Sequence, residues 1–400
     1  MAKQISVGID IGSFETKVII AQSSADSGRG IHQIIGTGVS ESRGVEKGYI
    51  VGSEEAALSV KRAIEIAEKA AGVRVKRAYV SFGGVGLGSI TATGSVAITR
   101  ADLEITERDL DLCLETAEMA IPKSALINKR VINEIPVEYK LDGKIAWGDP
   151  LGLKAQKLEV KALFLVCLEH HLADLIKTVE LAGVEVVDVV AAPVGASFVT
   201  VSKKQRRVGC LLADIGAETT SVIVFENNNP VSLEVFPIGG MDITNDIALG
   251  LKVSLEEAET IKFGGFSRTP YSKKKLDDIV SARLGDCFEL IEKHLKSIGR
   301  DSLLPAGVML TGGSAGIAGI KNFAQDFLGL PAEIASIHFG EGQSNKIRET
   351  IWATACGLSL LGFDSNEESR IFGKRGGVLT PEGGSEMFRK FSRWISQFLP

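Results

Sequence analysis

The chain has few cysteines and histidines for its length, and neither residue type forms a cluster that binds metal. The 400-residue sequence contains five cysteines, which are widely spaced and form no CxxC pair, and five histidines. We therefore expect buried thiols in a reducing compartment, with no disulfide framework and no zinc site. The adjacent His170 and His171 have no cysteine or acidic cluster at ligand spacing, so a catalytic histidine is not expected either.

The sequence also lacks long hydrophobic runs and a basic stripe. Its longest apolar stretch, residues 184–201, is interrupted by Glu185, Asp188 and Pro193, which predicts a buried strand leading into a helix and not a membrane span. The N-terminus has no charged segment followed by an apolar core, so no secretion signal is expected. A net charge of −5 without interleaved basic and aromatic residues argues against nucleic acid as a partner. With 44% hydrophobic residues, the chain is expected to fold into several compact units.

Two stretches far apart in the chain share one pattern. Residues 10–20 read DIGSFETKVII, and residues 214–224 read DIGAETTSVIV. In both, an apolar run ends in Asp, a glycine turn follows, and a second run rich in β-branched residues returns, which is typical of a β-hairpin. A single Asp-x-Gly turn is an ordinary structural feature. Two such turns with matched flanks predict a protein of two related halves, whose hairpins face each other across a cleft.

The composition of these hairpins suits phosphate and a divalent cation. Glycine has no Cβ, so backbone N–H groups can approach a phosphate closely, and the hydroxyls of Thr16 and Thr219 add donors. Lys17 supplies a positive charge. The residues expected to bind phosphate are Gly12, Ser13, Phe14, Lys17, Gly216, Ala217 and Thr219. The carboxylates of Asp10 and Asp214 are expected to hold Mg²⁺, directly or through its water molecules.

Glycine-rich segments later in the chain suit a nucleoside. Residues 308–317, VMLTGGSAGI, predict a buried strand, a glycine turn and a following helix, and residues 238–246, IGGMDITND, lead into another helix. Ser254 followed by Glu257 indicates a helix N-terminus with a capping box. The residues expected near the nucleoside are Gly239, Gly240, Glu259, Lys262, Gly312, Gly313 and Ser314. Glu259 and Lys262, three residues apart on one helix face, are equally compatible with a solvated ion pair.

In this order, the motifs resemble the phosphate-1, phosphate-2 and adenosine motifs of the actin, Hsp70 and sugar-kinase superfamily. Residues 81–94, SFGGVGLGSITATG, and 131–143, VINEIPVEYKLDG, further resemble the small domain inserted in the FtsA family of bacterial cell-division actins. The resemblance covers nearly the whole chain. It implies an α/β fold of the actin-like (ribonuclease H-like) type, with two halves, an inserted small α+β domain and a C-terminal amphipathic helix. It also implies ATP and Mg²⁺ as cofactors.

The positions of the motifs suggest a division into domains. The expected units are residues 1–83 and 163–207 (first actin-like subdomain, 1A), 84–162 (inserted domain, 1C), 208–229 and 303–362 (second core, 2A), 230–302 (adenine-covering lobe, 2B), 363–385 (flexible linker) and 386–400 (amphipathic helix). In relatives that hydrolyse ATP, an acid or amide before a helix orients the attacking water, but Ala192 stands at the comparable position here. We therefore expect weak hydrolysis or none.

The C-terminal segment differs in composition from the rest of the chain. Residues 373–400 contain five basic and two acidic residues, a net charge of +3, which leaves −8 for residues 1–372. At helical spacing, its large apolar side chains lie on one face and its basic side chains on the other, which is typical of a helix in a membrane surface. The residues expected in the membrane are Met387, Phe388, Phe391, Trp394, Ile395, Phe398 and Leu399. The alternative is that this helix docks on its own protein or on another helix.

The resemblance implies self-association into filaments on an anionic lipid surface, and partners among other division proteins. It places the protein in the cytoplasm, peripheral to the cytoplasmic face of the cell membrane at the division site. It also implies that the 2B lobe binds the C-terminal peptide of the tubulin-like protein FtsZ. Arg283, which we expect near the start of a helix, is a candidate contact for this acidic peptide or an ordinary solvated charge.

Three alternatives have weaker support from the sequence. A type IV pilus assembly actin homologue is the nearest, but the insert motifs and the terminal amphipathic helix favour the division family. A small-molecule kinase of the superfamily needs a catalytic acid that the sequence does not show. A chaperone of the Hsp70 type carries a substrate-binding domain after its ATPase, whereas here a linker and one helix are expected after it.

Overall fold

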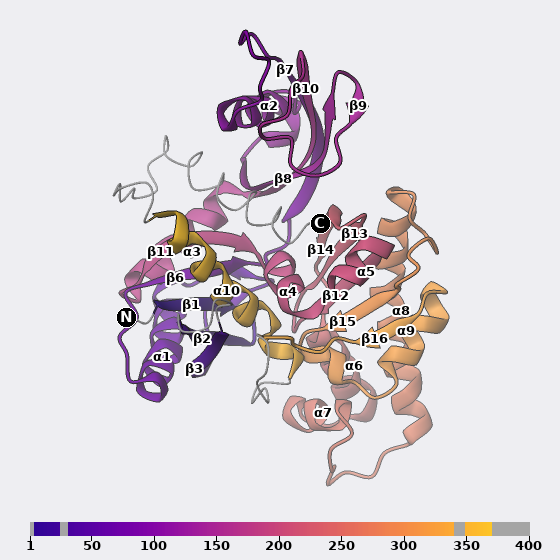
Figure 1. Cartoon of the computed structure of the whole chain (residues 1–400). Helices are drawn as coiled ribbons and strands as arrows, with labels where there is room; N and C mark the ends of the chain where they lie inside the picture. Colours follow the sequence, from indigo (N-terminus) through magenta and orange to yellow (C-terminus); the bar gives the residue numbers. More distant parts are fainter. Residues whose placement is uncertain (1–3, 25–30, 340–348, 370–400) are drawn as a thin grey trace.

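The computed structural model describes residues 4–24, 31–339 and 349–369. Figure 1 shows two α/β halves side by side and a smaller domain that projects beyond them. The two expected hairpins are present, one in each half. The smaller domain is built from residues 88–168, so its last strand, Lys157–Leu168, extends past the expected end of the insert at residue 162. The chain therefore has the actin-like two-half architecture with an inserted α+β domain.

The first half contains a five-stranded sheet in the order β11-β6-β1-β2-β3. Its strands are β1 (Gln4–Ile11), β2 (Glu15–Ser24), β3 (Ile31–Glu41), β6 (Arg77–Phe82) and β11 (Glu185–Ala191). The hairpin β1–β2 is antiparallel, and β6 pairs parallel to both β1 and β11. Helix α1 (Ser53–Ala71) lies directly on β3, because a Cβ on Gly38 would come within 1.9 Å of the Ala63 carbonyl oxygen. Helix α3 (Glu169–Leu181) packs beside α1.

The second half contributes strands to a nine-stranded sheet in the order β16-β15-β12-β13-β14-β7-β10-β8-β9. Its own strands are β12 (Cys210–Ile215), β13 (Thr220–Glu226), β14 (Asn229–Phe236), β15 (Val308–Thr311) and β16 (Ala332–Ile334). Its helices are α6 (Gly240–Leu251), α7 (Leu255–Lys262), α8 (Lys273–Ser297) and α9 (Ile320–Leu328), with short turns of 3₁₀ helix at η2 (Gly313–Gly316) and η3 (Thr350–Trp352). These helices and one face of the sheet enclose a separate apolar core that includes Phe288 and Ile291.

The inserted domain forms the other end of this nine-stranded sheet. It contains β7 (Gly88–Ala97), β8 (Lys129–Leu141), β9 (Lys144–Ile145), β10 (Lys157–Leu168), α2 (Glu107–Met119) and η1 (Lys123–Leu126). Helix α2 crosses β7 at Gly94, where a Cβ would lie 2.3 Å from the Cys113 carbonyl oxygen. Strand β7 meets β14 of the second half through one register pair, and the Ser89 hydroxyl hydrogen-bonds both the N–H and the C=O of Leu233. The insert is thus attached by its chain to the first half and by hydrogen bonds to the second.

Two short helices connect the halves, and a small two-stranded ribbon contacts α3. The apolar stretch 184–201 forms β11 and then α4 (Ala192–Thr200), which confirms the predicted strand-to-helix segment. Helix α5 (Lys203–Val208) then leads into β12. The ribbon consists of β4 (Val45–Glu46) and β5 (Tyr49–Ile50), joined by a tight turn.

Two elements fall on the other side of the expected domain division. Helix α10 (Ala353–Ser369), whose residues up to 362 were expected in the second core, packs against β1, β2, β6 and α4 of the first half. Gly8 and Gly357 permit this close packing, because a Cβ on Gly357 would lie 1.8 Å from the Gly195 carbonyl oxygen. Strand β14, expected in the 2B lobe from residue 230, belongs to the core sheet because it pairs with β13.

All five cysteines are buried and free, as predicted. Burial raises the pKa of the Cys210 thiol to about 12, and the other four thiols are shifted in the same direction for the same reason. These groups are protonated at neutral pH and pack as small apolar side chains.

Candidate functional site

The two hairpins meet at a cavity between the halves with a volume of about 300 Å³. Its walls contain residues of both repeated motifs, of α7, and of the turn after β15. The candidate residues that line it are Asp10, Gly12, Ser13, Phe14, Lys17, Asp214, Gly216, Ala217, Thr219, Glu259, Lys262, Gly312, Gly313 and Ser314. The fold therefore brings together most of the side chains that the sequence singled out.

The repeated motifs form the same backbone turn. The Gly12 N–H donates to the Glu15 carbonyl oxygen at 3.2 Å, and the Gly216 N–H donates to the Thr219 carbonyl oxygen at 2.9 Å. In both turns the glycine leaves the cavity-facing backbone uncovered by a side chain. Thr219 lines the cavity as expected, but Thr16 does not. Thr16 is fully buried, and its hydroxyl pairs with that of Ser42 at 2.9 Å on the other side of the strand.

Asp10 and Asp214 face the cavity from opposite halves. The pKa of Asp214 is raised to about 7, first because the group is removed from bulk water and second because Asp10 lies nearby, whereas Lys17 acts in the opposite direction. Loss of hydration also raises the pKa of Asp10, which Lys17 and a 2.7 Å hydrogen bond from the Ser81 hydroxyl partly offset. Two poorly solvated carboxylates beside each other form a site that favours a bound cation.

Lys17 is the cation nearest to these carboxylates in the first hairpin. It lies opposite Asp10 in the β1–β2 register, and only 9% of its surface is exposed. Its ammonium group is 3.3 Å from the Glu15 carboxylate. Both glutamates of the motif turns, Glu15 and Glu218, line the cavity as well. Among the residues that the structure describes, the cavity walls contain several carboxylates and few cations. This arrangement disfavours a bare anion and suits an anion that binds together with a divalent cation.

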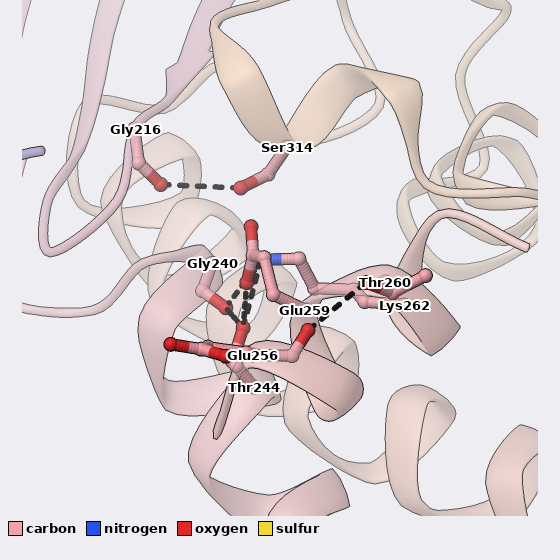
Figure 2. A network of polar contacts seen from close by, with 8 residues as sticks. All are labelled: Gly216, Gly240, Thr244, Glu256, Glu259, Thr260, Lys262 and Ser314. Atoms are coloured by element: carbon pink, nitrogen blue, oxygen red, sulfur yellow. Dashed lines mark hydrogen bonds and ion pairs between the residues drawn. The ribbon is translucent and has the colours of Figure 1, made fainter. Parts of the chain in front are cut away.

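At the other end of the cavity, Lys262 and Glu259 form an ordered polar network and not a solvated pair. Figure 2 shows the Lys262 ammonium group directed toward Gly240, Thr244 and Glu259. Its distances are 3.1 Å to the Gly240 carbonyl oxygen, 2.9 Å to the Thr244 hydroxyl and 2.7 Å to the Glu259 carboxylate. The Thr244 hydroxyl also donates to Glu259. Burial lowers the pKa of Lys262, and the hydrogen bond to Glu259 opposes this shift.

Gly239 and Gly240 support the second hairpin without lining the cavity themselves. The Gly240 N–H donates to the Gly216 carbonyl oxygen at 2.9 Å. A Cβ on Gly239 would lie 2.4 Å from the Ala217 carbonyl oxygen. The Ser314 hydroxyl also donates to the Gly216 carbonyl oxygen, at 3.2 Å, as Figure 2 shows. The next residue, Met241, does reach the cavity wall. These glycines allow α6 and η2 to approach the hairpin closely.

Helix α7 begins as predicted but uses one capping residue differently. The Ser254 hydroxyl accepts from the Glu257 N–H at 3.2 Å, as an N-cap does. The Glu257 carboxylate, however, accepts from the hydroxyls of Ser267 and Thr269 and from the N–H groups of residues 268 and 269. It therefore fixes the loop after α7 and does not complete a capping box.

Arg283 lies in the middle of α8, which begins at Lys273, and not near the start of a helix as expected. Its guanidinium is 2.7 Å from the Asp246 carboxylate and 3.3 Å from that of Asp286. About a third of its side chain is exposed. It is therefore a surface cation that already has acidic partners.

Several cavity residues were not identified as site residues from the sequence. They are Ile11, Glu15, Gly48, Ser81, Gly83, Glu218, Ser221, Met241, Phe263, Thr350, Ile351 and Thr354. Ala192, which was singled out from the sequence because it has no group to orient water, also lines the cavity. Glu15, Glu218 and Ser221 lie inside the repeated motifs, and Phe263 directly follows Lys262, so their positions gave a signal. Gly48 comes from the β4–β5 turn and Thr350 from η3, and only the fold brings these distant segments to the cavity.

Some predictions concern residues outside the described part of the chain. The linker from residue 370 onward and the apolar residues from Met387 to Leu399 fall there. Among the described helices, none combines the length and the hydrophobicity that crossing a membrane requires. Within the same described residues, no cluster of three or more His, Cys, Asp or Glu side chains is arranged to hold a metal.

Family models match two parts of the chain. Residues 211–357 match the model for cell division protein FtsA, and residues 84–166 match the SHS2 domain inserted in FtsA. The cell division protein FtsA of Bacillus subtilis is 30% identical over 401 residues, which cover 95% of this chain and 87% of that protein. The chain belongs to the FtsA family of cell division proteins. The FtsA protein of Pseudomonas aeruginosa is 27% identical over 412 residues, 97% of each chain.

Solved structures show the same fold beyond the FtsA family. The PilM-PilN type IV pilus biogenesis complex has a TM-score of 0.65 at 18% identity and covers 89% of this chain and 98% of that one. MreB5 of Spiroplasma citri bound to ADP has a TM-score of 0.53 at 12% identity, covering 93% and 99%. At these identities the likeness concerns the fold alone. Membership of the FtsA family, and not of the pilus assembly proteins, rests on the sequence relatives and the insert.

Proposed function

We propose that this FtsA-family protein binds ATP with Mg²⁺ between its two hairpins and uses the bound nucleotide to hold its halves together. The observation that carries this proposal is that both Asp-x-Gly turns, Lys17 and the Glu259–Lys262 network line a single cavity. A phosphate chain would lie between the turns, and the nucleoside would lie toward α7 and the Gly312–Gly313 turn. The MreB5 relative of the same fold is described with ADP bound.

The residues present fit a magnesium ion that remains partly hydrated. Asp10 and Asp214 provide two carboxylates whose raised pKa values reflect poor hydration, and a nearby cation would favour their ionised forms. Mg²⁺ commonly binds through one or two carboxylates together with nucleotide phosphates and waters. When bound, the ion would supply positive charge that offsets the repulsion between the phosphates and the carboxylates of the cavity walls. Ala192 lines the cavity without a group to orient water, so hydrolysis is expected to be slow.

Nucleotide binding is tested directly by titrating ATP, in the presence of Mg²⁺, into the full chain by calorimetry. Saturable binding that is lost on removal of Mg²⁺ supports the proposal, whereas no binding to the folded protein contradicts it. Asp214→Ala serves as the comparison for hydrolysis, which is measured as phosphate release. Fast turnover by the wild type that Asp214→Ala abolishes would overturn the expectation of a slow ATPase.

We further propose that the protein polymerises on the cytoplasmic face of the cell membrane and anchors FtsZ at the division site. Membership of the FtsA family supports a role in division, and the basic amphipathic segment from Glu386 onward supports a lipid anchor. Sedimentation with vesicles containing phosphatidylglycerol, in the presence of ATP, compares the full chain with a version truncated after Gly384. Equal sedimentation of both would show that this segment is not the anchor.

Contact with the FtsZ peptide is assigned to the lobe around α8, with Arg283 as the candidate residue. An acidic peptide would have to compete with Asp246 and Asp286 for this guanidinium. Titration of the peptide against the wild type and Arg283→Glu tests the assignment. An unchanged Kd in the folded variant would remove Arg283 from the interface.

A further inference from the structure

The turn between β4 and β5 lies at the cavity between the two hairpins. Lys47 and Gly48 both have positive φ values, 48° and 74°. The turn is tightly packed, because a Cβ on Gly48 would lie 2.7 Å from the Gly83 carbonyl oxygen and from the Gly84 Cα. The Val85 N–H also donates to the Lys47 carbonyl oxygen at 3.2 Å. The direction of the N–H groups in this turn is therefore fixed by the backbone around them.

Two successive N–H groups of this turn are each bonded to a side chain of a different hairpin. The Lys47 N–H donates to the Glu218 carboxylate of the second hairpin at 2.5 Å. The Gly48 N–H donates to the Ser13 hydroxyl of the first hairpin at 3.0 Å. Gly48, Ser13 and Glu218 all line the cavity. Successive backbone N–H groups in such a turn form a concavity that binds anions, and here the Glu218 carboxylate takes the Lys47 N–H while the Ser13 hydroxyl takes the Gly48 N–H.

We propose that the Lys47 N–H binds the terminal phosphate of a nucleoside triphosphate, and that the Glu218 carboxylate occupies this position in its absence, while the Gly48 N–H stays bonded to Ser13. This inference rests on the proposed binding of nucleotide in the cavity. A diphosphate leaves the Lys47–Glu218 hydrogen bond in place, whereas a triphosphate replaces the carboxylate. The turn thereby distinguishes the two nucleotides through one exchange of anions.

The charges around the turn explain why the exchange has a cost. A carboxylate and a terminal phosphate cannot share the same N–H group, and their like charges repel at short range. Binding of the triphosphate must therefore break a charge-assisted hydrogen bond that binding of the diphosphate leaves intact.

The test compares the Kd values of ATP and ADP, both with Mg²⁺, for the wild type, Glu218→Gln and Glu218→Ala. Removal of the competing charge should raise the affinity for ATP relative to ADP by about ten- to a hundredfold, the effect of one charge-assisted hydrogen bond. Glu46→Gln is the matched control, because Glu46 is an exposed glutamate in the same ribbon that does not line the cavity. The ratio of its Kd for ATP to its Kd for ADP should equal that of the wild type.

The outcomes separate this inference from the function on which it rests. If the wild type binds neither nucleotide, the proposed function itself fails. If it binds both but the Glu218 variants leave the ratio unchanged, the anion exchange is wrong while nucleotide binding stands. If the Glu218 variants instead bind ATP more weakly relative to ADP than the wild type does, Glu218 assists binding of the triphosphate. This result would also overturn the inference. The ADP affinity of each variant reports whether its cavity is folded.

Discussion

The two hairpins of this protein have the same backbone but different side-chain chemistry. In both, a glycine N–H closes the turn on the carbonyl oxygen three residues later, and an aspartate ends the first strand. In the first hairpin, the residue paired with Asp10 is Lys17, whereas Ser221 is paired with Asp214 in the second. The first hairpin therefore carries its own cation, and the second does not.

This difference also appears in how each aspartate is stabilised. Asp10 accepts a hydrogen bond from Ser81 and lies opposite Lys17, and both effects lower its pKa against the effect of burial. The pKa of Asp214 is raised to about 7 by burial and by Asp10, with Lys17 in the other half as the opposing influence. Asp214 thus depends on Lys17 of the other half, or on a bound cation, to balance its negative charge.

The comparison teaches that the repeat preserves geometry and not function. The Asp-Ile-Gly triplet is the same in both motifs, where the turn and the strand end require it, while the residues that follow the glycine differ, as SFETK at 13–17 and AETTS at 217–221. The first hairpin is suited to hold phosphate by its lysine. The second, with Glu218 at its tip, is suited to respond to the charge that arrives.

The strongest test of this asymmetry replaces each of the two register-equivalent residues, Lys17 and Ser221, by alanine in a separate variant. Lys17→Ala should weaken binding of MgATP by about 100-fold, because it removes a buried charge-assisted contact and leaves the carboxylates of Asp10 and Glu15 uncompensated. Ser221→Ala, at the position opposite Asp214, should change the Kd by less than about threefold. Calorimetric titration of both variants measures the difference. Equal losses of affinity would mean that the two hairpins contribute in the same way.

A second, smaller predicted effect concerns the packing of α10 on the first half. Gly357→Ala should lower the free energy of unfolding by about 2 kcal/mol, because the new Cβ would collide with the Gly195 carbonyl oxygen of α4. Gly285→Ala is the matched control, because this glycine of α8 has as its nearest neighbour the Phe323 ring, 4.0 Å away. Alanine there should stabilise the helix by about 0.5–1 kcal/mol. Urea titration of both variants measures these changes. An unchanged free energy of unfolding in Gly357→Ala would argue against close packing of α10 on the first half.

The fold could be predicted from the sequence where a local pattern required one structure. The apolar runs that end in Asp10 and Asp214, with the glycine turns and β-branched runs after them, predicted both hairpins, and the interrupted apolar run at 184–201 predicted β11 and α4. The position of α10 could not be read in this way. It follows β16 of the second half in the chain, yet Gly8 and Gly357 allow it to pack against β1 and α4 of the first, a contact that sequence neighbours do not reveal.

The candidate site shows the same limit. Lys17 and Lys262 were identified because each lies within a recognisable motif or helix face. Gly48 reaches the cavity from the β4–β5 turn and Thr350 from η3. The sequence of these segments has no distinguishing pattern, and only the tertiary fold places them there. Thr16 was misassigned because side chains alternate along a strand, so the residue next to Lys17 points into the core toward Ser42.

The smallest predicted effect is a pH dependence in the second half. His294 of α8 lies 2.9 Å from the Ser232 hydroxyl of β14, and burial lowers its pKa below the usual 6.5. The folded state therefore favours the neutral ring, so its contribution to stability is complete above pH 6.5 and is lost as the pH falls through the folded-state pKa. His294→Gln should reduce the loss of stability between about pH 7.5 and 5, measured by urea titration. His338→Gln, at an exposed histidine that contacts Ser336 in the same way, should leave that slope unchanged, and an equal effect of both variants would refute the role of burial.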